Sequence, residues 1–203
     1  MKKEIFKRIG FPEKKGLYDP SFEKDACGFG FIADINNEPK HEIVHQALDI
    51  VHKLDPRGAI GADPLAGDGA GILIQLPDKF FRDYFKSQKI SLPELGNYAV
   101  GMVFLPNDIT RSSIAQKAVE QAISDEGQIF IGWRDVPTDD TVLGKSVINN
   151  KPIIKQFFIQ RSSKCKDENH FQRKLYVIRK TVHKKIHQSN LLEWEDFYIV
   201  SLS

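Results

Sequence analysis

The chain has 203 residues, which is enough for one large domain or two small ones with a substantial buried core. Hydrophobic residues make up 41% and charged residues 28%, a balance typical of a folded protein and not of a disordered one. The 29 basic and 27 acidic residues give a net charge of +2, without the clustered excess of a nucleic-acid-binding surface.

Two cysteines are too few for a secreted fold held together by disulfides. The basic N-terminus is not followed by the apolar run of a signal peptide, and no stretch approaches the ~20 apolar residues of a membrane span. We therefore expect a cytoplasmic protein that binds neither membranes nor nucleic acid.

The first 26 residues are polar and are interrupted by glycine and proline, so we expect either a leader or arm outside the core or a frayed N-terminus. A short run rich in Phe and Ile predicts a buried strand at Gly28–Ile35. Apolar residues at helical spacing predict a helix over His41–Leu54, which Pro56 ends. A second buried strand, Gly71–Leu76, is expected after a glycine-rich loop at Gly58–Gly71.

Beyond these elements the pattern alternates between helices and strands. The expected helices cover Lys79–Lys86, Ile109–Asp125, with Asp108 as its cap, and Phe171–His187. The expected strands cover Asn97–Leu105, Gln128–Trp133, Ile153–Gln160 and Phe197–Leu202. In the last helix, the residues expected to face the core are Leu175, Ile178, Val182 and Ile186. Mixed elements of this kind indicate an α+β fold with helices packed on sheet faces.

The two cysteines differ in setting. Cys165 lies in a polar loop, where we expect an exposed thiol without a role. Cys27 stands where a loop enters an apolar strand, and Gly28 after it allows a ligand or another backbone to approach closely. Cys27 is therefore either a buried structural cysteine or a nucleophile. A nucleophile needs a base, which is either a histidine or its own α-amine after cleavage before Cys27.

Histidines spaced by four can present two metal ligands, as at His41 and His45 and at His183 and His187. Neither pair has the accompanying cysteine or carboxylate ligands of a zinc site, so we expect no metal.

The segment from Arg57 to Gly71 is rich in glycine. It is not typical of a phosphate-binding loop, because such loops precede a helix and this one precedes an expected strand. It also lacks a Gly-Lys-Ser/Thr ending. The alternative is a folded loop beside an active site, with Arg57 and Asp68 as its charged positions. Arg57 could then bind a carboxylate or carbonyl group in a fork geometry.

A series of longer motifs runs through the chain. They are Leu17–Pro20, Asp25–Gly30, Arg57–Ala59 with Gly61–Asp63, Gly67–Leu73, Val136–Asp140 with Val142–Gly144, Arg173–Lys180 and Phe197–Ser203. In this order they closely resemble the start of the large chain of the glutamate synthases, over essentially the whole sequence.

The resemblance implies a class II glutamine amidotransferase domain with the N-terminal-nucleophile hydrolase fold, a four-layer αββα sandwich that would be incomplete in this chain. It implies that residues 1–26 are a propeptide and that residues 27–203 are the N-terminal part of the domain. The Cys27 thiolate would attack the side-chain amide of L-glutamine, with its α-amine as base. Ammonia would leave, and water would hydrolyse the glutamyl thioester. The residues implied to support the site are Gly28, Arg57, Asp68 and Gly69.

The resemblance also implies partners and cofactors in a longer protein. Ammonia would pass to a synthase domain of the same chain, which makes L-glutamate from 2-oxoglutarate with FMN and an iron–sulfur cluster. Electrons would come from NAD(P)H through a small FAD-bearing flavoprotein subunit, or from ferredoxin.

Two features depart from the resemblance. The family commonly has His before Arg-Gly-Ala, whereas Asp55 and Pro56 precede Arg57 here. The family's substrate-binding Arg, oxyanion Asn-Gly pair and amine-binding carboxylate would lie beyond Ser203, so we expect this piece alone to lack glutaminase turnover. A second hypothesis is a non-catalytic binding or interaction module on the same fold, with Cys27 structural.

Overall fold

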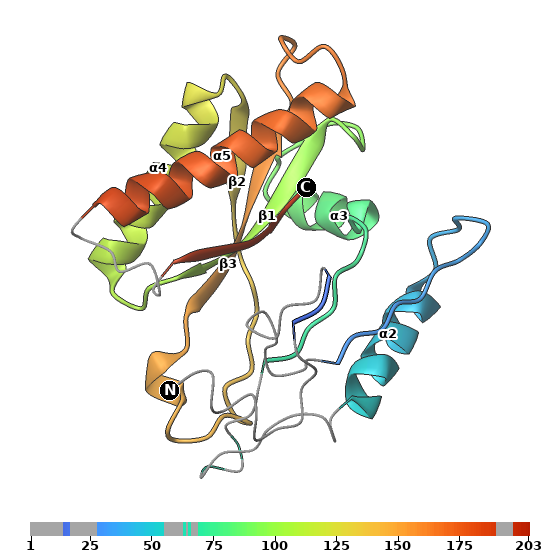
Figure 1. The fold of residues 1–203 in the computed structure, drawn as a ribbon. Coiled ribbons are helices and arrows are strands. Elements are labelled where there is room, and N and C mark those ends of the chain that lie inside the picture. The colour runs from blue at the N-terminus through green and yellow to red at the C-terminus, as the bar shows by residue number, and fades with distance from the viewer. Residues whose placement is uncertain (1–13, 17–27, 55–62, 64, 66–68, 190–196) are drawn as a thin grey trace. The chain divides into compact units, whose positions relative to one another are not determined.

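The structure is a computed structural model that describes residues 14–16, 28–54, 63, 65, 69–189 and 197–203. The chain divides into two compact units, most of whose elements Figure 1 labels. The first unit comprises Met1–Ala59 and Gly67–Ile72, and the second comprises Ile60–Ala66 and Leu73–Ser203. We describe each unit by itself.

A four-stranded antiparallel sheet with the order β2-β3-β1-β4 forms the second unit (Figure 1). Its strands are β1 (Tyr98–Leu105), β2 (Ile129–Asp135), β3 (Ile153–Gln160) and β4 (Tyr198–Leu202). The central strands β1 and β3 pair without interruption from Tyr98 opposite Gln160 to Leu105 opposite Ile153. Bulges interrupt the outer pairings, between Met102 and Val103 for β4 and between Phe130 and Gly132 for β2.

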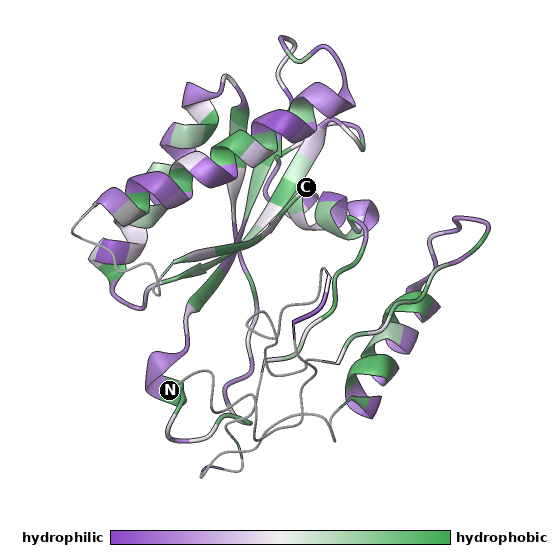
Figure 2. Ribbon diagram, viewed as in Figure 1, coloured by the Kyte–Doolittle hydropathy of each residue, from purple (hydrophilic) through white to green (hydrophobic). Residues whose placement is uncertain are grey.

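One face of this sheet is covered by α4 (Ile109–Asp125) and α5 (Glu168–Gln188), which contribute apolar stripes to a common core. Figure 2 shows the hydrophobic residues alternating with polar ones along both helices. Asp108 caps α4 by accepting a bond from Arg111 N at 2.7 Å, and Asp167 caps α5 from His170 N at 2.6 Å. The four inward residues predicted for α5 are all buried.

The short helix α3 (Asp78–Ser87) packs on other sheet residues through Phe81 and Phe85. Both rings meet Phe158 of β3 edge to face, with centroids 5.0 and 4.6 Å apart. Arg82 donates to Asp78 Oδ2 at 2.7 Å, and Tyr98 of β1 donates its hydroxyl to Asp78 Oδ1 at 2.8 Å. The aspartate therefore links α3 to the central strand of the sheet.

Most sequence predictions are confirmed here, since every helix and strand expected between residues 79 and 202 exists within a few residues of its predicted bounds. A 3₁₀ helix covers Ile148–Asn150 before β3. The prediction of an exposed Cys165 is wrong. Its side chain is 8% exposed, and its Sγ lies 3.5 Å from Gln128 Oε1, because the loop before α5 folds back over the core.

The strands predicted at Gly28–Ile35 and Gly71–Leu76 are also wrong, because both segments are irregular in the structure. Phe29, Phe31 and Leu73 are more than 80% exposed, so the segments are not buried either. Apolar composition alone does not make a strand, which needs a neighbour to complete its hydrogen-bond ladder. Within the described parts of the chain, no helix combines the length and apolar character needed to cross a membrane.

The pairing of β1 with β3 depends on Gly101, which lies opposite Phe157. A Cβ at Gly101 would overlap the Phe157 ring, whereas one at Gly132 would meet Phe85 at an ordinary 3.8 Å. We expect Gly101→Ala to lower the free energy of unfolding by about 1–3 kcal/mol through overpacking, and Gly132→Ala to cost far less. Urea unfolding of both variants checks this, and equal losses would contradict it.

The Asp78 contacts predict a pH-dependent stability. The Arg82 guanidinium lowers the pKa of the Asp78 carboxyl below its ordinary 3.8, an effect that partial burial opposes and the Tyr98 hydroxyl reinforces. The lowered pKa contributes stability that is present above pH 3.8 and is lost as the pH falls through the folded-state value.

Removing the hydroxyl with Tyr98→Phe should lower the free energy of unfolding by about 1 kcal/mol near neutral pH. This difference should shrink as acid protonates Asp78, because a neutral carboxyl accepts a weaker hydrogen bond. Tyr176→Phe, at a tyrosine that is 63% exposed, is the matched control. Denaturant unfolding at successive pH values measures both differences, and a Tyr98→Phe difference that does not change with pH would refute this role.

Candidate functional site

Three of the predicted site residues, Cys27, Arg57 and Asp68, lie outside the described residues, as does most of the predicted leader. Gly28 and Gly69 are described. The structure therefore gives the surroundings of two predicted positions and of the segments that lead to the other three.

The segment that follows Cys27 lies directly on α2 (His41–Lys53), as the close run of the two in Figure 1 shows. A Cβ at Gly28 would lie 2.6 Å from Leu54 Cδ2, and one at Gly30 would lie 2.7 Å from Ile50 Cγ2. Real Cβ atoms are not found this close to a neighbour. Both glycines thus permit an approach that no other residue allows without rearrangement.

The two contacts differ in how easily the neighbouring side chain could move aside. Leu54 Cδ2 is the far end of a flexible side chain and can rotate away, whereas Ile50 Cγ2 is attached to the branched Cβ, whose χ1 is restricted in a helix. Leu54 is the C-cap residue of α2, and Arg57 follows it by three residues in the sequence. The contact between Gly28 and Leu54 therefore joins the start of the described 28–54 segment to the end of its helix.

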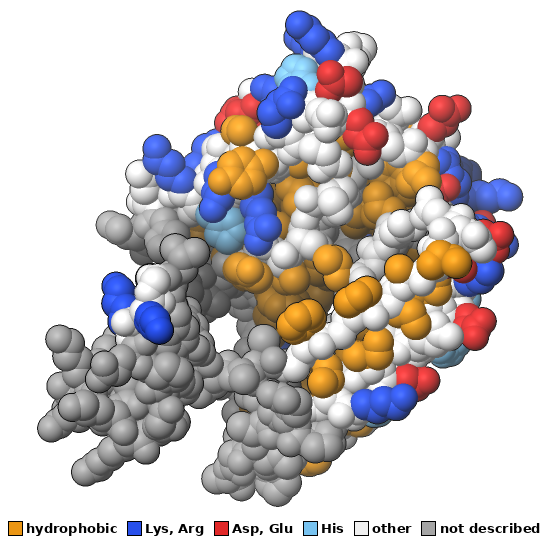
Figure 3. Space-filling view, turned by 45° about the vertical axis from the view of Figure 1, so that its right-hand side comes forward, with side chains coloured by type: hydrophobic (Ala, Val, Ile, Leu, Met, Phe, Trp, Pro, Cys, Tyr) orange, Lys and Arg blue, Asp and Glu red, His pale blue; other side chains and the backbone are white. Residues whose placement is uncertain are grey.

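The side chains that follow each of these glycines are exposed. Phe29 and Phe31 are 85% and 88% exposed. Figure 3 shows hydrophobic side chains at the molecular surface in a view that brings the right-hand side of Figure 1 forward. Gly69 is also open, since a Cβ there would have nothing within 4 Å.

Asp63, in the glycine-rich segment, makes a contact that the sequence did not predict. Its carboxylate accepts a hydrogen bond from Leu65 N at 3.0 Å and bonds from the hydroxyl and the backbone N–H of Ser146. These bonds, that from the Ser146 hydroxyl above all, lower the pKa of the Asp63 carboxyl. No local pattern signals a partner that lies 83 residues away.

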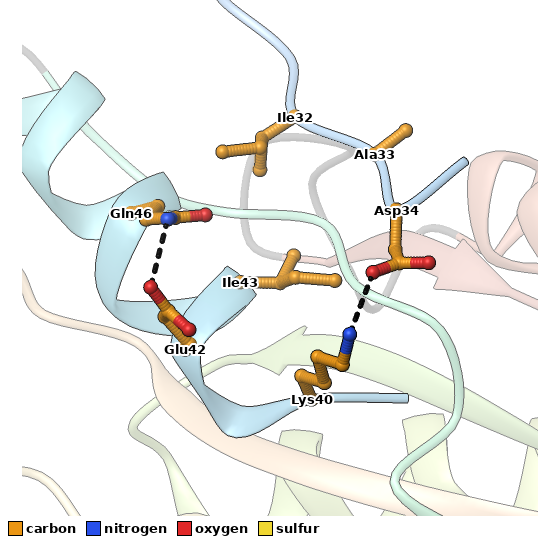
Figure 4. A pocket seen from close by; sticks show the side chains of 7 residues that line it. All are labelled: Ile32, Ala33, Asp34, Lys40, Glu42, Ile43 and Gln46. Carbon is orange, nitrogen blue, oxygen red and sulfur yellow. Dashed lines mark hydrogen bonds and ion pairs between the residues drawn. The ribbon is translucent and has the colours of Figure 1, made fainter. Parts of the chain in front are cut away.

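A shallow pocket in the first unit holds none of the predicted site residues (Figure 4). It is lined by Ile32, Ala33, Asp34, Lys40, Glu42, Ile43 and Gln46. The Lys40 ammonium lies 3.1 Å from Asp34 Oδ2, and Gln46 donates to Glu42 Oε1 at 3.2 Å. The backbone N–H of Glu38, then Lys40 and the N–H of Asn36, lower the pKa of Asp34. These polar groups bind one another, so they do not identify a ligand.

Three of the histidines considered as ligands, His41, His45 and His183, make aromatic contacts. The rings of His41 and His45 meet edge to face at 4.7 Å, and His183 lies 5.7 Å from the ring of Phe197. In the described part of the chain, no group of three or more His, Cys, Asp or Glu residues is arranged to hold a metal ion.

Comparison with known proteins identifies a family. The model of the class II glutamine amidotransferases matches residues 27–203. The chain is 43% identical over 192 residues to the NADPH glutamate synthase large chain of Bacillus subtilis, 41% over 182 residues to a ferredoxin-dependent glutamate synthase of Pyropia yezoensis, and 37% over 202 residues to the NADH glutamate synthase of Saccharomyces cerevisiae.

These alignments cover 95%, 89% and 95% of this chain but only 12%, 12% and 9% of the relatives. The chain thus spans about a tenth of the length of the curated relatives it matches, and it is homologous to their N-terminal part.

The packing of the 28–34 segment on α2 gives a direct test. Gly30→Ala should push the segment off Ile50 and raise its rate of proteolytic cleavage several-fold, because a loosened segment is cut faster. Ile50→Ala in the same chain removes Cγ2 and should restore protection. Gly71→Ala is the matched control, since a Cβ there meets nothing within 4 Å. Equal cleavage of the Gly30→Ala chain and the unsubstituted chain would contradict the contact.

Proposed function

The chain belongs to the class II glutamine amidotransferase family, and we propose that it is the glutaminase part of a glutamate synthase. It hydrolyses L-glutamine and supplies ammonia. The longer protein uses this ammonia to make L-glutamate from 2-oxoglutarate. The observation that carries this proposal is the family match, which begins at Cys27 and runs through residue 203.

Cys27 is the nucleophile in this proposal. Removal of residues 1–26 frees its α-amine, whose pKa in an unperturbed chain is about 7.7–8.0, so the amine can take the thiol proton near neutral pH. The thiolate attacks the amide carbon of glutamine, the C–N bond breaks, and ammonia leaves with the proton that the amine returns. Water then attacks the thioester, which releases glutamate and restores the thiol.

The supporting residues have distinct roles. The Arg57 guanidinium binds a carboxylate or carbonyl oxygen of the substrate or of the site in a fork geometry. Gly28 lets the nucleophile's segment lie on α2, as its approach to Leu54 supports. Asp68 and Gly69 belong to the glycine-rich sequence segment, and the open space around Gly69 is compatible with a close ligand. Pro56, next to Arg57, restricts the backbone where the family commonly has histidine.

The fold that accompanies this function is the four-layer αββα sandwich of the N-terminal-nucleophile hydrolases. The second unit supports it with an antiparallel sheet covered by the helices α4 and α5. The exposed Phe29 and Phe31 are apolar enough to join a second sheet once strands pair with them.

The cofactors of a glutamate synthase belong to other parts of the longer protein. An iron–sulfur cluster is held by a set of cysteine thiolates, commonly four, whereas this chain has two cysteines, one of them the nucleophile and the other buried at 8% exposure. FMN likewise lies with the synthase domain. The printed names of the relatives include NADPH, NADH and ferredoxin forms, so the electron donor is either a nicotinamide with a small flavoprotein subunit or ferredoxin. We place the protein in the cytoplasm.

Cys27→Ser in the full-length protein should abolish glutamine-dependent glutamate synthesis and leave ammonia-dependent synthesis unchanged, because only the glutaminase step needs the thiolate. Steady-state assays with each nitrogen donor measure this. Cys165→Ser is the matched control and should retain both activities. If the Cys27→Ser protein keeps its glutamine-dependent rate, Cys27 is structural and the chain is a binding or interaction module.

The processing step has its own test. Intact-mass analysis of the full-length mature protein should show Cys27 as the first residue, because only a free α-amine at that position can act as the base. A different first residue would refute the processing proposal. The 203-residue piece alone should release no ammonia from glutamine, since the oxyanion donors are proposed to lie outside it.

A further inference from the structure

The helix α5 carries a strong excess of positive charge. Its 21 residues include six lysines and arginines against one acidic residue, Glu168. The whole chain has a net charge of only +2, so the rest of the sequence is net acidic. Charge concentrated on one helix creates a local positive potential that the composition of the whole chain conceals.

Two of these cations are paired with the neighbouring helix. The Lys174 ammonium lies 2.8 Å from Glu126 Oε2, and the Lys185 ammonium lies 2.8 Å from Asp125 Oδ2. Asp125 is the last residue of α4 and Glu126 is its C-cap. These two pairs join α5 to α4, so they account for two of the six positive charges.

The outer face of α5 carries a group of residues that we call the basic stripe. Its members recur at helical spacing and are all exposed, and they are Arg173, Tyr176, Val177, Lys180 and Lys184. This spacing places them opposite the buried stripe of the helix, which runs from Leu175 to Ile186. In the described part of the chain, none of the three cations of the basic stripe forms an ion pair.

Two apolar side chains lie between these cations. Tyr176 is 63% exposed and Val177 is 40% exposed. Lys180 Nζ lies 5.6 Å from the centre of the Tyr176 ring, a cation–π contact that favours one place for the ammonium. Tyrosine and arginine are enriched in protein interfaces, where exposed aromatic rings supply much of the binding energy. The composition of the basic stripe is therefore that of a protein interface.

We propose that the basic stripe docks against an acidic surface in another part of the longer protein. This inference rests on the proposed function, in which the chain is the glutaminase part of a glutamate synthase. The relatives are about ten times as long as the chain, so such a part has a large neighbouring surface to meet. Carboxylates of that surface pair with the three cations, and an apolar group covers Tyr176 and Val177. A nucleic acid fits less well, because its phosphate backbone offers no apolar surface to these two side chains.

Carbodiimide cross-linking of the full-length protein tests the proposal, because this reagent joins a lysine amine directly to a carboxylate that it contacts. Peptide mass spectrometry should recover Lys180 and Lys184 joined to Asp or Glu residues outside residues 1–203. The pairs of Lys174 with Glu126 and of Lys185 with Asp125 are internal positive controls, since each ammonium lies 2.8 Å from its carboxylate.

Charge reversal gives a second measurement. Arg173→Glu/Lys180→Glu should lower the yield of the Lys184 cross-links about tenfold, because repulsion replaces attraction at two of the three cations. Lys86→Glu, at an exposed lysine of α3, is the matched control and should leave that yield unchanged. The cross-link of Lys174 to Glu126 should persist in both variants and show that α5 is still folded on α4.

Three outcomes would overturn the proposal. The first is recovery of the two control pairs without any link from Lys180 or Lys184 to a residue outside 1–203. The second is that these lysines are linked only to carboxylates within residues 1–203, such as those of the first unit. The third is an unchanged Lys184 yield in the charge-reversed protein. Failure of the proposed function is read separately, from the activity of Cys27→Ser, because cross-linking does not depend on turnover.

Discussion

The closest packing constraint in the first unit is the approach of Gly28 and Gly30 to Leu54 and to Ile50 of α2. Two residues without side chains bring the backbone that follows Cys27 onto Ile50 and Leu54. Leu54 ends the helix from which the chain proceeds to Arg57. The glycines are required there for space and not for an unusual backbone angle.

Glycines also permit close packing at two positions of the second unit. Gly101 of β1 leaves room for the Phe157 ring across the central strand pair, and Gly144 leaves room for the Asp63 carboxylate. In each case an absent side chain lets a larger group of a distant segment fit closely. The α4 and α5 helices and the Asp78 contacts hold the sheet on which the loops depend.

Sequence reasoning succeeded where periodicity and burial agree. The stripe from Leu175 to Ile186 predicted the inner face of α5, and Asp108 was identified as the cap of α4. The prediction of a strand at Gly28–Ile35 was wrong, because an apolar run indicates a tendency toward burial but not whether a neighbouring strand pairs with it. The burial of Cys165 was not predicted, because its polar neighbours in the sequence do not indicate that the loop folds over Gln128.

For the candidate site, too, some features could be predicted from the sequence and others could not. The motifs around Cys27 and Arg57 pointed to the family that the comparison identifies. The contact between Asp63 and Ser146 could not be predicted, because it joins residues 83 apart through geometry that only the folded chain creates.

The central claim is that Cys27, and not the chain's other cysteine, is the nucleophile. It is tested most directly by treating the full-length protein with a glutamine analogue that carries a diazoketone electrophile and mapping the adduct by peptide mass spectrometry. The account predicts one adduct in this chain, on Cys27, and none on the buried Cys165. An adduct on Cys165, or an unmodified Cys27 in protein that hydrolyses glutamine, would contradict it.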